Sequence, residues 1–444
     1  MRLSTLSKVT KWYRNARRES KFVQRPSPFS LCFVFGRRLP CRRATCVLNR
    51  SVPRTTSIYI HFPWCLKKCP YCDFVSYAKK EAEIDHEGYA DAVIREIEAR
   101  SDGFTGEIGS IFFGGGTPSL WRTGALTRVM TALRDRFRIA TLPSGELSIE
   151  VTAECNPTSL DLEKARGLRA AGLNRLSIGV QSLDQKELSY LGRLHDGDGA
   201  LRAIEGAFAA GFKNVSGDLI FGLPGQTTAS AVAIAESLVK SGVPHLSAYQ
   251  LTIEPGTQFG ELARLKRLPL ADDGVVADSF LAISSLLRSH GFEHYEISNY
   301  AKPGHRSMHN SAYWRGDDYF GFGTAAVGRI GRTRYRNEPD PARYMDRTRT
   351  LVSGVFGLAD GVAESEEKLD DTAIVRERLM LGLRMTDGID MDGLEAEGLP
   401  IRTREREKTL LRLAERGRIE SDGRSVRIPR SQWLFCNDTV ASLF

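Results

Sequence analysis

The sequence predicts an α/β fold organised around a mostly parallel β-sheet, with a smaller α+β module at its C-terminal end. From residue 57 onward, short runs of β-branched and aromatic residues alternate with amphipathic segments, and this unit repeats six times. Three clustered cysteines and a run of three glycines directly follow predicted strands. Repeated strand–helix units give parallel strands joined by right-handed crossovers. The repeated strand–helix pattern is compatible with either a doubly wound sheet or a curved partial barrel.

The first strand, residues 57–62, ends at Pro63 and leads into a loop that carries Cys65, Cys69 and Cys72. This spacing lets three thiolates converge from a single loop. A structural zinc ion takes four protein ligands, usually from two cysteine pairs, and the sequence offers no second pair. A 4Fe-4S cluster with three thiolate ligands leaves one iron open for a ligand that is not protein. The spacing therefore favours an iron–sulfur cluster.

The remaining strands follow in order, each with a helical segment behind it. A helix with Tyr89, Val93 and Ile97 on one face comes after the cysteine loop. The later strands are predicted at residues 110–113, 147–153, 174–180, 214–221 and 245–253. Ligands of α/β sheets bind at the carboxyl ends of the strands. Glycine-rich or polar positions stand at these ends, namely residues 114–119, Glu154, Asn156, Gln181 and residues 222–227. The sequence thus predicts a ligand site on this rim.

Two carboxylates are predicted inside the fold. Glu150, Thr152 and Glu154 alternate along the third strand and therefore share one face. A carboxylate buried on that face needs a partner. A salt bridge to Arg175 is one candidate partner, and a polar ligand at the rim is the other.

These residues resemble those of a known family. The cysteine triad, with Tyr71 before its last member, resembles the signature of the radical S-adenosylmethionine (SAM) superfamily. The sequence that flanks the triad, from Tyr59 to Phe74, resembles that of the HemW branch, whose members are haem chaperones related to oxygen-independent coproporphyrinogen III oxidase. The resemblance covers about residues 57–444. It implies a partial (β/α)6 barrel, one 4Fe-4S cluster on the three cysteines, and SAM on the open iron.

The same resemblance implies the cofactor contacts. The glycine turn would bring Gly115, Gly116 and Thr117 to SAM, and Glu154 would add a polar contact. Four further residues lie in segments that resemble sequence motifs of the family, and they are expected to contact SAM or to line a second ligand pocket: Tyr59, Gln181, Arg193 and Asp218. Taken singly, the glycines are also explained by a tight turn, and the polar residues by hydrogen bonds within the barrel core.

A further family word lies beyond the sixth strand. The segment His309-Asn310-Ser-Ala-Tyr313-Trp314 resembles the motif that has been tied to haem in the HemW branch. Imidazole is the commonest ligand of haem iron, and Tyr and Trp offer flat surface to a macrocycle, so we expect haem on His309. Because the neutral imidazole is the ligand, binding is expected to fade below histidine's usual pKa of about 6.5. The alternative is a satisfied core histidine.

The resemblance predicts a SAM- and cluster-binding haem chaperone that transfers haem to an acceptor protein and takes electrons from a donor. One alternative is an oxygen-independent coproporphyrinogen III oxidase, and another is a scaffold with a structural metal. Phe74 stands where the oxidase carries a further cysteine, so we do not expect oxidase activity. Val327 stands where the family word usually has histidine, so any role of that histidine is absent here.

The charge distribution sets residues 1–56 apart. They hold fourteen Lys or Arg and a single acid, Glu19, for a local charge of +13 within a chain of net +8. The body from residue 57 is therefore mildly acidic, and no nucleic-acid partner is expected. A basic, acid-poor leader is typical of transit peptides, but the segment shows no amphipathic helix with a cleavage site, which favours a mis-assigned start. We expect a cytoplasmic protein, or a mitochondrial one if the leader is a transit peptide.

Four regions are predicted. Residues 1–56 form a disordered leader, residues 57–260 the radical SAM barrel core, residues 261–365 a post-barrel region with the histidine motif, and residues 366–444 a C-terminal domain like that of HemN. No apolar run approaches the length of a membrane span, which leaves room only for transient contact with a membrane protein.

Overall fold

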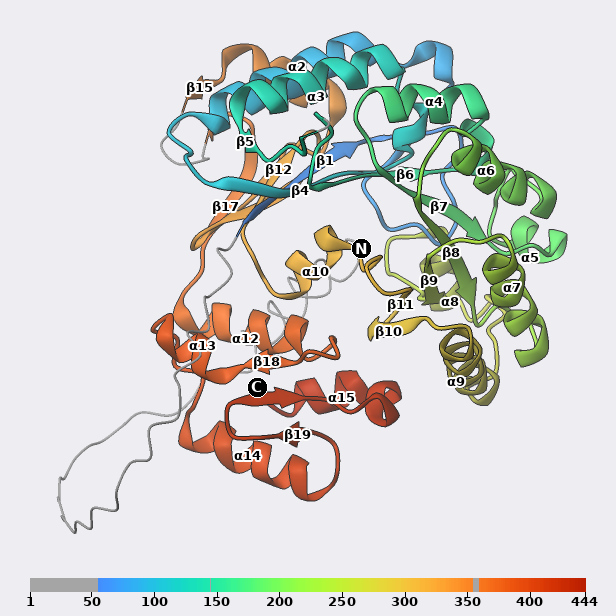
Figure 1. The fold of residues 1–444 in the computed structure, drawn as a ribbon, viewed down its shortest axis with the longest axis vertical. Coiled ribbons are helices and arrows are strands. Elements are labelled where there is room, and N and C mark those ends of the chain that lie inside the picture. The colour runs from blue at the N-terminus through green and yellow to red at the C-terminus, as the bar shows by residue number, and fades with distance from the viewer. Residues whose placement is uncertain (1–54, 144, 354–358) are drawn as a thin grey trace. The chain divides into compact units, whose positions relative to one another are not determined.

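The computed structural model describes residues 55–143, 145–353 and 359–444. The predicted leader lies outside these ranges except for its last two positions. At the centre of the described chain is one thirteen-stranded sheet (Figure 1). Six neighbouring strands of this sheet are parallel. They are β1 (Thr56–Phe62), β4 (Glu107–Gly115), β6 (Glu150–Cys155), β7 (Arg175–Gln181), β8 (Asn214–Phe221) and β9 (His245–Gln250). The predicted α/β fold with six parallel strands is therefore confirmed.

The sheet extends beyond the six parallel strands at both edges. Next to β1 lies the parallel strand β12, followed by three antiparallel strands, and next to β9 lie two antiparallel strands. These are β12 (Tyr319–Phe322), β13 (Val327–Ile330), β14 (Thr333–Asn337), β17 (Ala363–Lys368), β11 (Asn299–Ala301) and β10 (Glu293–Glu296). Among the described strands β1 and β9 do not pair with each other, so the six-stranded unit is an open barrel. The sequence did not predict these additional strands.

Helices cover the outer face of the parallel strands, as Figure 1 shows. They are α2 (His86–Ser101), α3 (Thr123–Arg136), α4 (Leu162–Ala170), α6 (Gly197–Ala209), α7 (Thr228–Lys240) and α9 (Asp273–Ser289). An Asp side chain accepts a backbone N–H at the start of α2, α4, α6 and α9, and Thr227 caps α7. Tyr89, Val93 and Ile97 of α2 are fully buried, in agreement with the predicted apolar face.

Strand β1 shows how the sheet separates its two faces. Ile58, Ile60 and Phe62 alternate along the strand and are fully buried in the main apolar core. Tyr59 and His61 project from the opposite face because successive side chains of a strand point to opposite sides. The outward face of β1 therefore anchors the fold, and its inward face is left for polar and aromatic groups.

The short helix α10 (Met308–Trp314) lies on the opposite side of the sheet from the covering helices and contacts β4 (Figure 1). It also contacts the C-terminal helix α12. The C-terminal elements are α12 (Asp371–Gly382), α13 (Met391–Ala396), α14 (Arg404–Glu415) and α15 (Cys436–Ala441), with a small sheet of β18 (Ile389–Asp390), β19 (Glu420–Ser421) and β20 (Ser425–Arg427). Gly423, at φ +86°, lies in the turn of the hairpin formed by β19 and β20. Within the described ranges, no helix has the length and apolarity needed to cross a membrane.

Candidate functional site

The cysteine loop leaves the carboxyl end of β1 and is fastened to the glycine turn after β4. The N–H of Gly116 donates to the carbonyl of Phe62 (2.7 Å), and that of Thr117 donates to the carbonyl of Trp64 (2.9 Å). Cys65, Cys69 and Cys72 are half-buried and free of disulfides. The loop therefore presents three thiols at the carboxyl end of the sheet, where the sequence predicted them.

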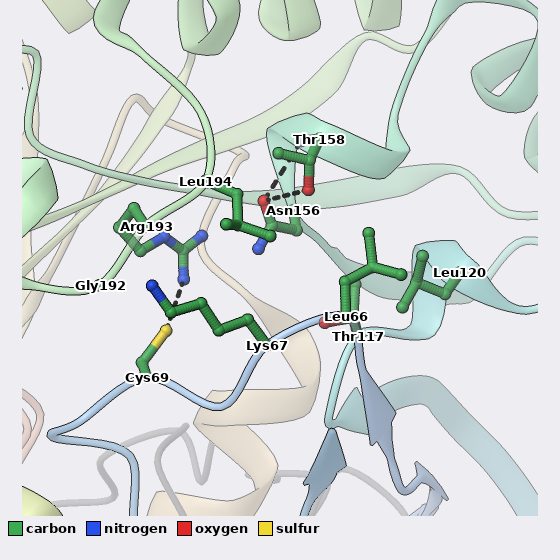
Figure 2. Close-up of a pocket in the computed structure, with 10 residues that line it drawn as sticks. All are labelled: Leu66, Lys67, Cys69, Thr117, Leu120, Asn156, Thr158, Gly192, Arg193 and Leu194. Atoms are coloured by element: carbon green, nitrogen blue, oxygen red, sulfur yellow. Dashed lines mark hydrogen bonds between the residues drawn. The ribbon is translucent and has the colours of Figure 1, made fainter. Parts of the chain in front are cut away.

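Burial and a nearby cation shape the chemistry of these thiols. Burial raises the pKa of Cys72 to about 12 and also raises that of Cys65, so both thiols hold their protons until a metal displaces them. The guanidinium of Arg193 points at Cys69 (Figure 2), with Nη1 3.6 Å from Sγ, while Nη2 donates to the carbonyl of Gly179 (2.9 Å). This fixed positive charge compensates a thiolate ligand.

The donor set fits a cluster better than a single ion. No three His, Cys, Asp or Glu side chains of the described ranges converge closely enough to hold one metal ion. A 4Fe-4S cluster binds each thiolate to a different iron, so its ligands need not meet at one point. Three thiols on one loop, with a cation beside the middle one, suit that requirement.

The glycine turn is closely packed against the protein itself. Gly115 has φ +109°, and a Cβ built there would lie 2.5 Å from the ring of His61; at Gly116 it would lie 2.6 Å from the carbonyl oxygen of Trp64. The tight-turn explanation therefore accounts for both glycines. The N–H of Gly115 also donates to Oε2 of Glu154 (3.1 Å), so the turn and the third strand are joined at the rim.

His61 connects the first strand to the end of the cysteine loop. Its Nε2 donates to the carbonyl of Val75 (2.8 Å), and burial lowers its pKa to about 4, so the ring is neutral and Nδ1 accepts from the hydroxyl of Tyr59 (2.9 Å). Burial, and secondarily Glu154, raise the pKa of Tyr59 well above its usual value. The Tyr59 hydroxyl thus donates its proton to His61, which leaves the ring and the oxygen lone pairs of Tyr59 for a ligand.

The buried polar atoms that have no hydrogen-bond partner among the described residues include Thr152 Oγ1, Gln181 Oε1 and Arg193 Nε. Gln181 also has φ +65°, a strained conformation for a residue other than glycine. Unsatisfied buried groups of this kind are uncommon in folded proteins and fit a polar ligand. Figure 2 shows the pocket nearby, lined by Leu66, Lys67, Cys69, Thr117, Leu120, Asn156, Thr158, Gly192, Arg193 and Leu194.

Asp218 lies deeper and is already satisfied. Its carboxylate accepts from the hydroxyls of Ser177 (2.8 Å) and Ser216 (2.9 Å), and Ser216 is in turn 2.7 Å from Nδ1 of His245. The core hydrogen-bond alternative therefore describes Asp218 in this structure. The residues brought together at the rim are the cysteines, the glycine turn, Glu154, Gln181 and Arg193.

The structure places His309 away from that rim. Its Nδ1 is 3.0 Å from Oγ of Ser110, near the start of β4, and its ring stacks on Phe112 with centroids 4.9 Å apart. Ser110 and Gly115 are five residues apart on one strand, which corresponds to about 16 Å. Ser110 and Gly115 therefore mark two separate places inside the barrel.

The start of α10 is held by a buried carboxylate. Glu150, the first residue of β6, accepts from the hydroxyl of Ser307 (3.1 Å) and from the backbone N–H groups of Met308 (2.9 Å) and His309 (3.2 Å). Arg175 lies 3.9 Å from the same carboxylate. The two carboxylates predicted to face inward thus have different partners. Glu150 pairs with Arg175 and holds the start of α10, whereas Glu154 accepts a hydrogen bond from the glycine turn.

Two expectations about the histidine motif are wrong. Trp314 is buried against Leu381 and Met385, and Tyr313 packs beside Tyr319, so protein covers the rings expected to offer flat surface to haem. Burial also lowers the pKa of His309 to about 3, with a smaller contribution from Arg175. The imidazole is therefore neutral throughout the physiological range, and its protonation would not weaken binding near pH 6.5.

Sequence reasoning missed three residues that organise the site: His61, Ser110 and Phe112. Their signal was the alternation of the strands, because Ser110 and Phe112 share the face that carries Gly114, and His61 shares the face of Tyr59.

Comparison with known proteins identifies the family. Residues 59–238 match the model of the radical SAM superfamily, and residues 369–435 match the HemN C-terminal domain. The chain is 40% identical to the heme chaperone HemW of Escherichia coli over 277 residues (62% of this chain, 70% of the relative). It is 34% identical to the heme chaperone HemW of Bacillus subtilis over 395 residues (87% and 98%).

The fold is also found in a solved structure. The coproporphyrinogen III oxidase HemN of Escherichia coli, a radical SAM enzyme, superposes with a TM-score of 0.72 at 22% sequence identity and covers 88% of this chain and 90% of its own. The cofactors of the radical SAM superfamily are a 4Fe-4S cluster and SAM, as the sequence predicted. The match to almost the whole Bacillus relative decides the branch: the chain belongs to the HemW family of the radical SAM superfamily.

Proposed function

We propose that this protein is a haem chaperone that binds one 4Fe-4S cluster, SAM and haem, and transfers the haem to an acceptor protein. Relatives named heme chaperone HemW support the class of function. The observation that carries the proposal is His309: a neutral, buried imidazole, stacked on Phe112, whose Nε2 has no hydrogen-bond partner among the described residues. A free imidazole nitrogen is what haem iron requires.

Residue roles at the rim follow from the contacts. Cys65, Cys69 and Cys72 would hold the cluster, which when bound supplies an electron and an open iron for SAM. Arg193 would stabilise the thiolate of Cys69. Further SAM contacts would come from the glycine turn (Gly115, Gly116, Thr117), from Glu154 and Gln181, and from Tyr59.

The separation between the two places argues for a chaperone. An oxidase must hold a tetrapyrrole propionate beside the reactive carbon of SAM. Here Ser110, the hydrogen-bond partner of His309, is about 16 Å along β4 from the glycine turn. The imidazole of His309 therefore lies away from the glycine turn, an arrangement that carriage of haem allows and that decarboxylation beside SAM does not favour. We propose a haem-accepting protein and an electron donor as partners, and the cytoplasm as the location.

Anaerobic reconstitution with iron and sulfide, followed by separate SAM and haem titrations, tests this function. We expect a cluster whose spectrum shifts with SAM and, independently, about one haem per chain. A protein that takes up the cluster and SAM but no haem would contradict the proposal.

A further inference from the structure

The hydroxyl of Ser110 lies between two groups. It is 2.9 Å from Oγ of Ser57 and 3.0 Å from Nδ1 of His309, and all three side chains are buried. Ser57 and Ser110 are cross-strand partners on β1 and β4, so the backbone register fixes their approach. The position of Ser110 is therefore set by the sheet and not by the histidine.

Counting hydrogens assigns the tautomer. The Ser110 hydroxyl has one proton, and it donates that proton to Ser57. Only a lone pair then remains for His309, so Nδ1 must carry the imidazole hydrogen and donate it to Ser110. The lone pair of the ring is consequently on Nε2.

Two other contacts hold the ring in place. Phe112 stacks on it with an interplanar angle of 24°, and Glu150 accepts the backbone N–H of His309 (3.2 Å). Neither contact distinguishes the ring nitrogens, because one acts on the ring face and the other on the backbone. The choice of tautomer falls to Ser110 alone among the described residues.

We infer that Ser110 is a positioning residue that holds His309 in its Nδ1–H tautomer and so keeps the Nε2 lone pair available to haem iron. The inference rests on the proposed function for its consequence, but the tautomer itself exists without haem. Ligating histidines commonly donate their second N–H to a fixed acceptor, and loss of that acceptor costs about 10- to 100-fold in affinity. Ser110 would be that acceptor here.

The test is nitrogen NMR of histidine-labelled, haem-free protein, with His309→Gln used to assign the resonances. The full-length chain should show a protonated Nδ1 and an unprotonated Nε2 at His309. Ser110→Ala should abolish this preference, and Ser57→Ala should reverse it, because the Ser110 proton would turn toward Nδ1. Ser279→Ala is the matched control: Ser279 is equally buried, but its hydroxyl faces Thr228 at 3.5 Å.

The second readout is haem affinity, with iron content and melting temperature showing that each variant folds. Ser110→Ala should bind haem about tenfold more weakly, and Ser279→Ala should match the parent. A protonated Nε2 in the parent, an unchanged tautomer in Ser110→Ala, or a retained Nδ1–H in Ser57→Ala would overturn the inference. If the parent binds no haem, the proposed function fails, and the NMR result still decides the tautomer.

Discussion

Glu150 and His309 are 159 residues apart in the sequence, and the carboxylate of the first accepts the backbone N–H of the second at 3.2 Å. The contact joins β6 to α10 and ties the histidine motif to the amino-terminal end of the parallel strands. It also gives a buried carboxylate a structural task, because Glu150 receives two further hydrogen bonds from the same helix start.

Glu150→Gln is expected to destabilise the protein. The substitution replaces three charge-assisted bonds with weaker ones and leaves Arg175 buried without its anion, so we expect a loss of about 3 kcal/mol in the free energy of unfolding. Glu146→Gln is the control, because Glu146 pairs with Arg169 at the surface and should contribute less than about 1 kcal/mol. Urea denaturation of both variants measures the difference, and equal costs would contradict the role given to Glu150.

Only the cysteines of the loop should hold iron. Serine at Cys65, Cys69 or Cys72 should abolish the cluster, whereas serine at the buried Cys155 or Cys436 should leave iron content unchanged. Iron and sulfide analysis after anaerobic reconstitution measures this. Stoichiometric zinc in place of iron would contradict the assignment.

Arg193 should tune the cluster without being required for its assembly. Arg193→Gln removes a positive charge and an N–H donor 3.6 Å from Cys69, so the reduction potential should become more negative. Arg193→Lys keeps the charge but loses the planar fork, and its potential should fall between the two. A redox titration followed by EPR measures the change. An unaltered potential in Arg193→Gln would separate Arg193 from the cluster.

The pH dependence of stability should report His309. Its pKa is about 3 in the folded chain and about 6.5 when unfolded, so the unfolded state binds the extra proton between these values. The stabilisation is complete above pH 6.5 and declines as the pH falls toward 3. Between pH 7 and pH 5 the parent should lose about 2 kcal/mol more than His309→Gln. Denaturation curves at the two pH values check this, and parallel losses would contradict the burial of the ring.

Much of the fold followed from local pattern, and the position of α10 did not. The six parallel strands were evident because each is a short run of β-branched or aromatic residues before a glycine or polar break. Strands β12, β13, β14 and β17 escaped prediction because they are short, most of them mix charged with apolar residues, and they lie outside the strand–helix repeat. Which end of the barrel α10 occupies depends on Glu150, and no spacing within the motif encodes that contact.

The rim was more predictable than the histidine site for a physical reason. Residues at the carboxyl ends of successive parallel strands lie at the same edge of the sheet, so the order of the strands along the chain shows which of these residues are close in space. The Ser110–His309 contact joins a strand to a helix that enters from outside the repeat. The sequence therefore predicted His309 as a candidate haem ligand, but it did not show that Ser110 sets the tautomer of His309 or that Trp314 packs against Leu381.

The most direct test of the account is haem titration of the reconstituted protein and its His309→Ala variant, with the exposed His290→Ala as the control. We predict about one haem per chain in the parent and in the control, and haem binding at least tenfold weaker in His309→Ala. The cluster and its response to SAM should stay intact in all three proteins. None of them should decarboxylate coproporphyrinogen III. Equal haem affinity in His309→Ala, or formation of protoporphyrinogen by the parent, would contradict the account.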